Sequence, residues 1–372
     1  MPPSYPASGT LRNGLFIKPV PSRFTPNQVS RYLSAIGYQP SYDALVVASG
    51  AFPLNPETLE RLMRLHLLTF PFENTQMHYT AEHDMEVSPE GLFSRFVNDK
   101  SGSYCFGHNA LFLDILRGLG FRRVLASSSQ HIRGYSVGAR VNIASTGSPH
   151  SFRAYNHLIL LVQPSKNDNQ TYVVDVGYGA SCLMRPLLLS ADPSNVIYGL
   201  TETERHRLAF ESRRDSSLSS SSDFSTTVGD LWNIEVGHRK STNDPESWHR
   251  QFAFSEYSET WQQDIEFSSF TVSHRLSEFF LGFVACVKVF TVDEPTETGE
   301  PPVERSKRAM YRIIISGNEL KKSYGAKSEV IRKFDTEVER IRALREIFCL
   351  KLKDEDVEYI KGRAAALPTP SA

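Results

Sequence analysis

Apolar residues recur at helical spacing in two stretches of the first third of the chain, 58–68 and 106–116. Asn55-Pro56, a typical N-cap and first-turn pair, precedes the first stretch. Glycines follow the second stretch and end its pattern. The pattern therefore predicts two helices, and it places Cys105 at or just before the N-terminus of the second one.

Beyond residue 120, short apolar or β-branched runs alternate with polar loops, as is typical of strands. No regular alternation of strands with helices appears, so the pattern favours an antiparallel sheet or barrel over a parallel sheet. A closing helix is predicted to begin at Thr336–Glu339, which matches a capping box. The predicted strands are 136–143, 157–162, 171–176, 284–291 and 310–316.

Three segments are predicted to lie outside this regular structure. Residues 1–26 are rich in Pro, Ser and Gly, and they predict a mobile arm or a strap over the surface. The serine-rich run 216–222 has too few apolar side chains to order itself, and it predicts a loop or linker. Residues 293–305, which include several prolines, predict a second exposed loop.

Composition and charge narrow the class of protein. The chain has 372 residues, 40% hydrophobic and 22% charged, which is typical of a soluble globular protein with two or three domains. A formal net charge of -1 gives no reason to expect nucleic acid as a partner. The four cysteines form no CxxC pair, so we expect no metal site and a reducing compartment. No run approaches the ~20 apolar residues of a membrane span, and no secretory signal is apparent, so the expected location is the cytoplasm.

A thiol, an imidazole and a carboxylate occur in local settings that suit covalent catalysis. Cys105 is expected at a helix N-terminus, where unpaired N–H groups and the positive end of the helix dipole favour a thiolate. The backbone N–H groups of Cys105 and Phe106 could also receive a developing oxyanion. His157 could serve as the base and Asp175 could hold its tautomer.

The pairing of His157 with Asp175 has a register argument. The loop 163–169 between their predicted strands is centred near residue 166, and both residues lie nine positions from that centre. In a symmetric hairpin they are cross-strand neighbours with Cβ atoms about 4.5–5.5 Å apart. A slip of one residue would place them on opposite faces. Each residue also has a structural interpretation, as a buried thiol, a satisfied histidine or a turn former, and the residues alone leave both interpretations open.

The motifs around these residues resemble those of the arylamine N-acetyltransferases, over roughly residues 28–360. Leu65-His66 with Pro71-Phe72-Glu73-Asn74 resembles the LH…PFEN segment of that family, and the residues around Cys105 resemble its RGGxC[FY]E.N motif. His157 fits the H-x-x-L-x-V strand. Further resemblances are Arg31–Tyr38 to the opening helix, Asp175–Gly179 with Pro186 to the DVGFG segment, and Leu344–Phe348 to the C-terminal helix.

The resemblance implies an α+β fold with a cysteine-proteinase-like core. Its expected parts are a helical N-terminal domain with the cysteine, an antiparallel β-barrel middle domain with the histidine and aspartate, and an α/β lid domain. The corresponding boundaries are 1–27 for an N-terminal extension, 28–120 for the helical domain, 121–228 for the barrel with the serine-rich loop near its end, and 229–372 for an interdomain segment and the lid.

The resemblance also implies ping-pong transfer of an acyl group from acyl-CoA to an arylamine or arylhydrazine, through an acyl-cysteine intermediate on a Cys105, His157 and Asp175 triad. Acetyl-CoA is the default co-substrate, malonyl- or propionyl-CoA is possible, and no tightly bound cofactor is expected. A malonyl carboxylate would need a nearby cation, for which Arg153 and Arg185 are candidates. The candidate substrate contacts are Phe72, Tyr178, Ala180 and Cys182.

The chain departs from the family pattern beside the nucleophile. Ser101-Gly102-Ser103 stands in place of Arg-Gly-Gly, and Gly107 in place of glutamate. His108, three residues after Cys105, could lie near the thiol and perturb it. The alternatives left open are a transglutaminase-like or other Cys-His-Asp acyl-transfer enzyme, an N-malonyltransferase variant of the same family, and a binding protein that kept the fold.

Overall fold

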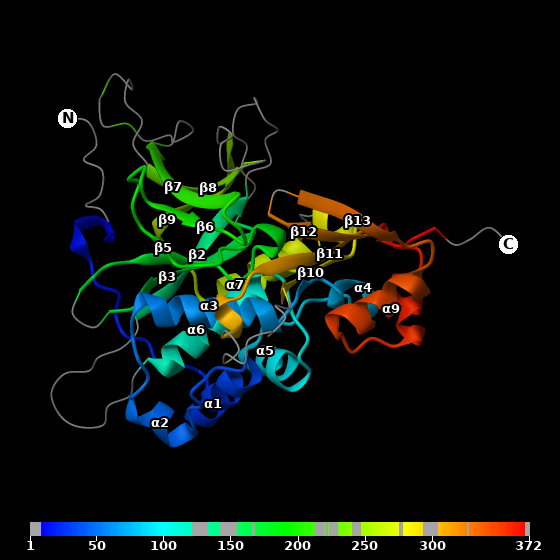
Figure 1. Ribbon diagram of the computed structural model, residues 1–372, viewed down its shortest axis with the longest axis horizontal. Coiled ribbons are helices and arrows are strands. Elements are labelled where there is room, and N and C mark those ends of the chain that lie inside the picture. Colours follow the sequence, from blue (N-terminus) through cyan, green and yellow to red (C-terminus); the bar gives the residue numbers. More distant parts are fainter. Residues whose placement is uncertain are drawn as a thin grey trace, which may run out of the picture.

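The structure is a computed structural model, and it describes residues 9–120, 133–141, 155–165, 168–212, 219, 222, 230–239, 247–274, 278–292, 304–325 and 327–368. Within this part of the chain, a group of helices and two sheets form an α+β molecule (Figure 1). Each strand pairing in the two sheets is antiparallel, which confirms the predicted preference over a parallel sheet.

The first third of the described chain is helical, as predicted. Asn55 Oδ1 accepts a hydrogen bond from the Thr58 N–H at 2.8 Å, and Pro56 is the first helical residue, so the predicted helix start is confirmed. The helices are α1 (Pro26–Ala35), α2 (Ala44–Ser49), α3 (Pro56–Thr69), α4 (Gln76–Tyr79), α5 (Pro89–Phe93) and α6 (Cys105–Leu119), with a π-helical turn η2 (Ser94–Asn98) before α6.

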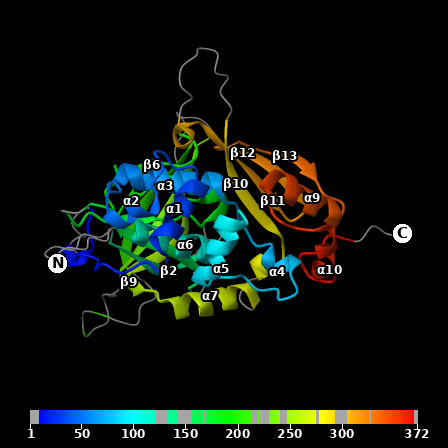
Figure 2. The same ribbon diagram turned by 90° about the horizontal axis from the view of Figure 1, so that it is seen from below.

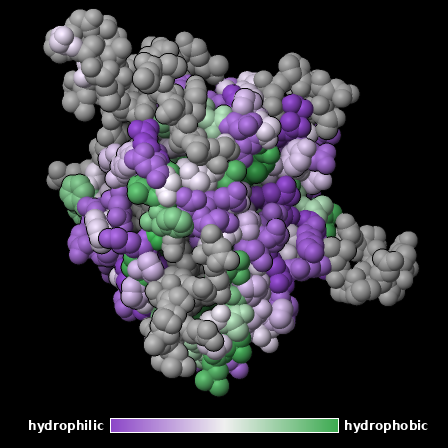
Figure 3. All heavy atoms as spheres, turned by 90° about the vertical axis from the view of Figure 1, so that its left-hand side faces the viewer, coloured by the Kyte–Doolittle hydropathy of each residue, from purple (hydrophilic) through white to green (hydrophobic). Residues whose placement is uncertain are grey.

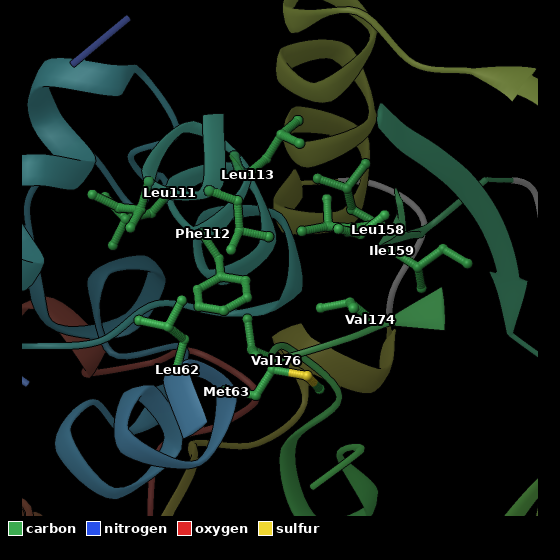
Figure 4. Packing of buried hydrophobic residues seen from close by; sticks show 14 of the residues in the cluster. Leu62, Met63, Leu111, Phe112, Leu113, Leu158, Ile159, Val174 and Val176 are labelled. Carbon is green, nitrogen blue, oxygen red and sulfur yellow. The ribbon is translucent and has the colours of Figure 1, made fainter. Parts of the chain in front are cut away.

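Helix α6 is the central helix of the molecule, and its residues from Cys105 to Leu116 are buried. Figure 4 shows Leu111, Phe112 and Leu113 of this helix between Leu62 and Met63 of α3 on one side and Leu158 and Ile159 of a strand on the other. Such all-round burial fixes a helix by packing rather than by propensity. The nucleophile candidate therefore stands at the end of a rigid element.

The larger sheet follows the order β5-β4-β3-β2-β9-β8-β7-β6. Its strands are β2 (Arg133–Val141), β3 (His157–Gln163), β4 (Tyr172–Val174), β5 (Leu187–Leu188), β6 (Val196–Tyr198), β7 (Glu204–Ser212), β8 (Asp230–His238) and β9 (Ser247–Glu259). β3 is buried along its whole length, and α6 packs on one of its faces.

The expected β-barrel is wrong, because the larger sheet is open. Among the described residues, the end strands β5 and β6 each pair with a single neighbour and not with each other. Both strands are very short, and the Asn195 side chain donates to the Leu188 and Ser190 carbonyls at 2.8 Å each. These carbonyls are therefore satisfied by a side chain where barrel closure would require a strand.

The smaller sheet joins distant parts of the chain. It has the order β1-β10-β11-β12-β13, and β1 comes from the helical part of the molecule. Its strands are β1 (Phe72–Glu73), β10 (Ala285–Thr291), β11 (Met310–Ser316), β12 (Glu319–Tyr324) and β13 (Lys327–Lys333). The α9 helix (Glu337–Phe348) packs on this sheet in a second core, and α10 (Val357–Ile360) follows it.

The capping box predicted for the closing helix is half formed. Thr336 accepts from the Glu339 N–H at 3.3 Å, whereas the Glu339 carboxylate accepts from the Asp335 N–H at 3.0 Å and not from that of Thr336. The helix nevertheless begins where the sequence predicts.

The described part of the N-terminal segment is a strap, which confirms one of its two predicted forms. Thr10 forms a bridge to Gln170, and the Ile17 N–H donates to the Gln163 side chain at 3.0 Å. Arg23 then pairs with Asp114 of α6. On the face of the molecule that carries this strap, apolar patches are interrupted by polar side chains (Figure 3).

The division of the chain into domains stays a prediction. β8 and β9, which follow the expected boundary at 228, pair into the larger sheet. After them, α7 (Gln262–His274) runs along the outer edge of the molecule (Figure 2), and α8 (Glu278–Leu281) leads to β10. Most of the serine-rich run 216–222 and residues 293–303 lie outside the described residues.

Candidate active site

Cys105 is the first residue of α6, as predicted, and only 3% of it is exposed. The N-cap residue Tyr104 does not cap the helix with its side chain, and its hydroxyl donates to the Ser269 carbonyl of α7 at 3.1 Å. No N-cap side chain therefore accepts a hydrogen bond from the backbone N–H groups of the first turn, which include those of Cys105 and Phe106. These groups lie at the positive end of the helix dipole.

His157 and Asp175 form a buried pair beside this helix end. His157 Nε2 lies 2.8 Å from Asp175 Oδ2, and Cys105 Sγ lies 3.9 Å from the carbonyl of the adjacent Asn156. Burial lowers the pKa of His157, but the Asp175 charge, the hydrogen bond to Asp175 and the interaction with Cys105 outweigh it and raise that pKa to about 10. The imidazole is therefore charged at neutral pH, and its Nδ1 is left for the thiol.

The predicted hairpin register is wrong by two residues, although the predicted contact is formed. β3 and β4 pair Leu160 with Val174, and this register places Ile159 opposite Asp175. His157 is thus a diagonal neighbour of Asp175 on the same face, since an even shift preserves the face. The turn is centred one residue later than expected, and Thr171, just before β4, donates its N–H to the Gly9 carbonyl of the N-terminal strap.

Asn109, which falls on the last position of the family motif around Cys105, ties the helix to the pair. Its Nδ2 donates to Asp175 Oδ1 at 2.9 Å and to the Leu158 carbonyl at 2.7 Å, while its Oδ1 accepts from the Val176 N–H at 3.1 Å. Its spacing of four residues from Cys105 on one helix was the available signal. Asn109 therefore orients the carboxylate relative to the thiol.

Gly177 allows the loop after Asp175 to approach Cys105. Its N–H donates to Asp175 Oδ1 at 2.8 Å. A Cβ at this position would lie 2.8 Å from Cys105 Cα and 2.9 Å from the Cys105 carbonyl oxygen. Only glycine fits such a close backbone approach.

Aromatic rings surround the imidazole. Tyr178 and Phe252 lie 5.0 Å and 4.8 Å from the His157 ring, and 5.0 Å from each other, between centroids. Phe72 lies across the loop from them, with a ring carbon 3.4 Å from the position that a Cβ would take on Gly179. Phe280 lies 6.3 Å from Phe72. Sequence reasoning missed Phe252 and Phe280, because no motif marks them.

The other two candidate contacts differ in character. Ala180 is half-buried in the short 3₁₀ turn η3 (Gly179–Ser181). Cys182 is buried, and its thiol donates to the Asp175 carbonyl at 3.1 Å. Burial raises the pKa of Cys182 well above its usual range, with the Asp175 charge acting in the same direction. Cys182 is therefore a neutral thiol at physiological pH.

The departures from the family motif have local structural counterparts. The Arg95 guanidinium, from η2, pairs with Glu73, and its Nε donates to the Gly102 carbonyl at 2.6 Å. A cation thus supports residues 101–104, which we call the nucleophile loop because they precede the candidate nucleophile Cys105, although residue 101 is serine. A Cβ on Gly107 would lie 2.2 Å from Ser103 Oγ, so the serine at 103 and the glycine at 107 fit one another.

His108 has both ring nitrogens engaged away from the thiol. Nδ1 lies 2.8 Å from His66 Nε2, and Nε2 lies 3.0 Å from the Pro71 carbonyl. Of the two cations considered for a malonyl carboxylate, Arg185 pairs with Glu60 at 3.0 Å, and Arg153 lies outside the described residues.

Two further findings concern the described part of the chain. It contains no cluster of three or more His, Cys, Asp or Glu side chains arranged to hold a metal ion. Among the same residues, no helix has both the length and the apolar character needed to cross a membrane.

Comparison of the sequence and the structure with those of known proteins identifies the family of this chain. A sequence model described as N-acetyltransferase matches residues 55–292. The N-malonyltransferase FDB2 of Fusarium pseudograminearum is 26% identical over 348 residues, which cover 90% of this chain and 92% of that protein. The arylamine N-acetyltransferase of Salmonella typhimurium has a similar structure, with a TM-score of 0.63 at 18% identity, over 90% of this chain and 97% of the other. That of Mycobacterium marinum in complex with CoA gives a TM-score of 0.59 at 20% identity, over 91% and 96%. The family match spans more than half of the chain, so the protein belongs to the arylamine N-acetyltransferase family and is an acyltransferase.

Proposed function

We propose that the protein transfers an acyl group from acyl-CoA to an aromatic amine through an acyl-Cys105 intermediate. The observation that carries the proposal is the buried His157–Asp175 pair, 2.8 Å apart, beside Cys105 at the N-terminus of α6. Family membership favours transfer from acyl-CoA over the transglutaminase-like alternative.

In the first half-reaction the Cys105 thiolate attacks the thioester carbonyl and forms a new S–C bond. The N–H groups of Cys105 and Phe106 stabilise the oxyanion. The bond to the CoA sulfur then breaks, and the protonated His157 supplies the proton that CoA needs to leave as a thiol. Asp175 orients the imidazole through its 2.8 Å hydrogen bond.

In the second half-reaction the amine attacks the acyl-Cys105 carbonyl. His157, now neutral, accepts the proton of the amine, and the C–S bond breaks to release the N-acylated product and the Cys105 thiolate. Two half-reactions that share one covalent intermediate give ping-pong kinetics.

The aromatic rings beside His157 suit a flat aryl substrate. Tyr178 and Phe72 are the proposed walls of the amine site, and Phe252 extends the Tyr178 side. Ala180 and Cys182 are proposed at its edge. The cytoplasm remains our proposed location, on the basis of the sparse cysteines.

The acyl donor is either acetyl-CoA, the family default, or malonyl-CoA. The malonyl alternative is supported by the fungal relative, which is an N-malonyltransferase. Arg185 is an imperfect candidate for the malonyl carboxylate, because it is already paired with Glu60. The donor is therefore best determined by direct competition.

Intact-protein mass spectrometry after brief mixing with acetyl-, malonyl- or propionyl-CoA, without amine, tests the intermediate and names the donor. We expect one acyl adduct on the native chain. The control variant Cys349→Ser removes an exposed thiol but keeps Cys105, so it should carry the same adduct. Cys105→Ala should carry no adduct, and an arylamine should discharge the native adduct. An adduct that persists in Cys105→Ala, or none from any donor on freshly reduced protein, would overturn the proposal.

A further inference from the structure

Four buried groups that the proposed reaction does not use form a chain of hydrogen bonds behind the nucleophile. Tyr32 of α1 has its hydroxyl 2.8 Å from His66 Nδ1 of α3, and His66 Nε2 lies 2.8 Å from His108 Nδ1 of α6. His108 Nε2 lies 3.0 Å from the Pro71 carbonyl oxygen. The three side chains are completely buried. We call Tyr32, His66, His108 and the Pro71 carbonyl the histidine relay.

The direction of each hydrogen bond in the histidine relay follows from its last member. A carbonyl only accepts, so His108 Nε2 carries the hydrogen and donates to Pro71. In a neutral imidazole the other nitrogen then accepts, so His66 Nε2 donates to His108 Nδ1. His66 Nδ1 in turn accepts from the Tyr32 hydroxyl. One tautomer of each histidine therefore satisfies the whole chain.

Both histidines are neutral at physiological pH. Burial lowers the pKa of His108 to about 4, against the opposing charges of Glu73 and Asp175 and the bond to Pro71. Burial, followed by the neighbouring His108, also lowers the pKa of His66 well below its usual range. A neutral, directional chain in a dry environment holds its members in one arrangement.

The histidine relay ends on the segment that lies against the nucleophile loop. The Pro71 carbonyl oxygen lies 1.6 Å from the position that a Cβ would take on Gly102, so the two backbones are in direct contact. The next residue, Phe72, forms a bridge to Ser103, and its ring stacks on His108 at 6.3 Å with an interplanar angle of 17°. His108 itself follows Cys105 by three residues on α6.

We propose that the histidine relay positions Phe72 against the first turn of α6, and so fixes where the aromatic amine meets the acyl-Cys105 bond. His108 is the central positioning residue, because its ring supports Phe72 and its Nε2 holds the preceding carbonyl. Tyr32 and His66 act through it. The inference rests on the proposed function, since Phe72 is there a wall of the amine site.

The test separates the two half-reactions in four variants of the full-length enzyme. His108→Phe keeps an aromatic ring and removes both hydrogen bonds, whereas His108→Gln retains an acceptor and a donor. Tyr32→Phe removes only the first donor of the relay. Tyr79→Phe is the matched control, because it removes a buried tyrosine hydroxyl that bonds to Glu337 and Arg340 in the other core.

Each variant is first acylated without amine, and its adduct is then discharged by increasing concentrations of an aromatic amine. We expect His108→Phe to raise the amine concentration for half-maximal discharge by about tenfold or more, since misplacements near 1 Å cost up to about a hundredfold. Tyr32→Phe should show a smaller shift in the same direction, His108→Gln should recover most of the loss, and Tyr79→Phe should leave the amine dependence unchanged. Acylation should stay within about threefold of the native rate in all four, because the donor does not use Phe72 in this scheme.

A purely structural relay gives a different result. Both half-reactions would then fall together, in proportion to folded protein, in the relay variants and in Tyr79→Phe alike, or neither would change. Either outcome overturns the inference. If His108→Phe fails to fold, the amine dependence of Tyr32→Phe and His108→Gln tests the inference in its place. Failure of the proposed function is distinguishable, because the native chain would then form no acyl-Cys105 adduct, and the inference would fall with it.

Discussion

The charge of a single carboxylate, Asp175, raises the pKa of His157 in the candidate site. Asp175 accepts hydrogen bonds from His157, Asn109 and the Gly177 N–H. This pattern suits the ionised carboxylate, whose oxygens only accept. Without the carboxylate, only the weaker interaction with Cys105 would oppose burial, and burial favours the neutral imidazole of His157. The protonation state of His157 therefore depends on Asp175.

Asp175→Asn should lower the pKa of His157 from about 10, because only the weaker interaction with Cys105 then opposes burial. The native His157 imidazole is charged below that pKa, and a charged imidazole favours the thiolate beside it. The native Cys105 should therefore react rapidly with iodoacetamide at neutral pH. In the variant the reaction at neutral pH should be slower, because a neutral imidazole does not favour the thiolate beside it. Turnover should fall by about 10²–10⁴-fold.

The measurement is the rate of Cys105 alkylation against pH, followed by mass. Asp192→Asn, at an exposed carboxylate, is the control and should leave the profile unchanged. Coincident profiles for the native chain and Asp175→Asn would show that Asp175 does not set the charge of His157.

At the scale of an element, the first turn of α6 shows how this chain tolerates its departures from the family motif. The family pattern has glycine where this chain has Ser103, and glutamate where it has Gly107. Ser103 Oγ is buried without a hydrogen-bond partner, and it occupies the space that a side chain at 107 would need. Compared with the family pattern, this chain therefore has its glycine at position 107 and its larger side chain at position 103.

Gly107→Ala should therefore destabilise the protein by about 1–3 kcal/mol, because its Cβ would lie 2.5 Å from Ser103 Cβ. Ser103→Gly should relieve most of this cost, so the two substitutions should be strongly non-additive in a double-mutant cycle. Urea unfolding of the two single variants and the double variant measures the coupling. Additive effects would mean that the two positions do not exchange space.

At the scale of the whole molecule, a buried ion pair joins the two sheets. Arg312 of β11 donates from both terminal nitrogens to the Glu204 carboxylate of β7, at 2.7 Å each. Burial raises the pKa of Glu204, but Arg312 outweighs it and lowers that pKa to about 2. The pair therefore fixes the smaller sheet against the larger one in a specific orientation.

Glu204→Gln should destabilise the protein by about 3–5 kcal/mol, because it leaves a buried guanidinium without its counter-charge. The contribution of the native carboxylate should be complete above the unfolded pKa of about 4.3 and should disappear as the pH falls towards the folded pKa of about 2. The native and variant stabilities should therefore converge in acid.

Urea unfolding between pH 2 and 7 compares the native chain with Glu204→Gln. Glu319→Gln is the control, since this carboxylate pairs with lysines at the surface and should matter little. A constant difference between the native chain and Glu204→Gln across this range would contradict the assigned ionisation of Glu204.

The sequence by itself determined what depends on neighbouring residues. The N-cap of α3 at Asn55, the start of α6 at Cys105 and the antiparallel strands were predicted correctly, because capping and periodicity are set within a few residues. The contact between His157 and Asp175 was also predicted, because the face of a strand follows from its period of two.

Only the tertiary structure decided what depends on distant segments. The register of the β3–β4 hairpin and the open order of the larger sheet depend on how whole strands pair, and the N-terminal strap bonds to Thr171 from far along the chain. The support of Arg95 for the nucleophile loop and the ring of Phe252 beside His157 come from segments that no local pattern connects to Cys105. Such contacts form only when helices and sheets pack, and packing is a property of the whole chain.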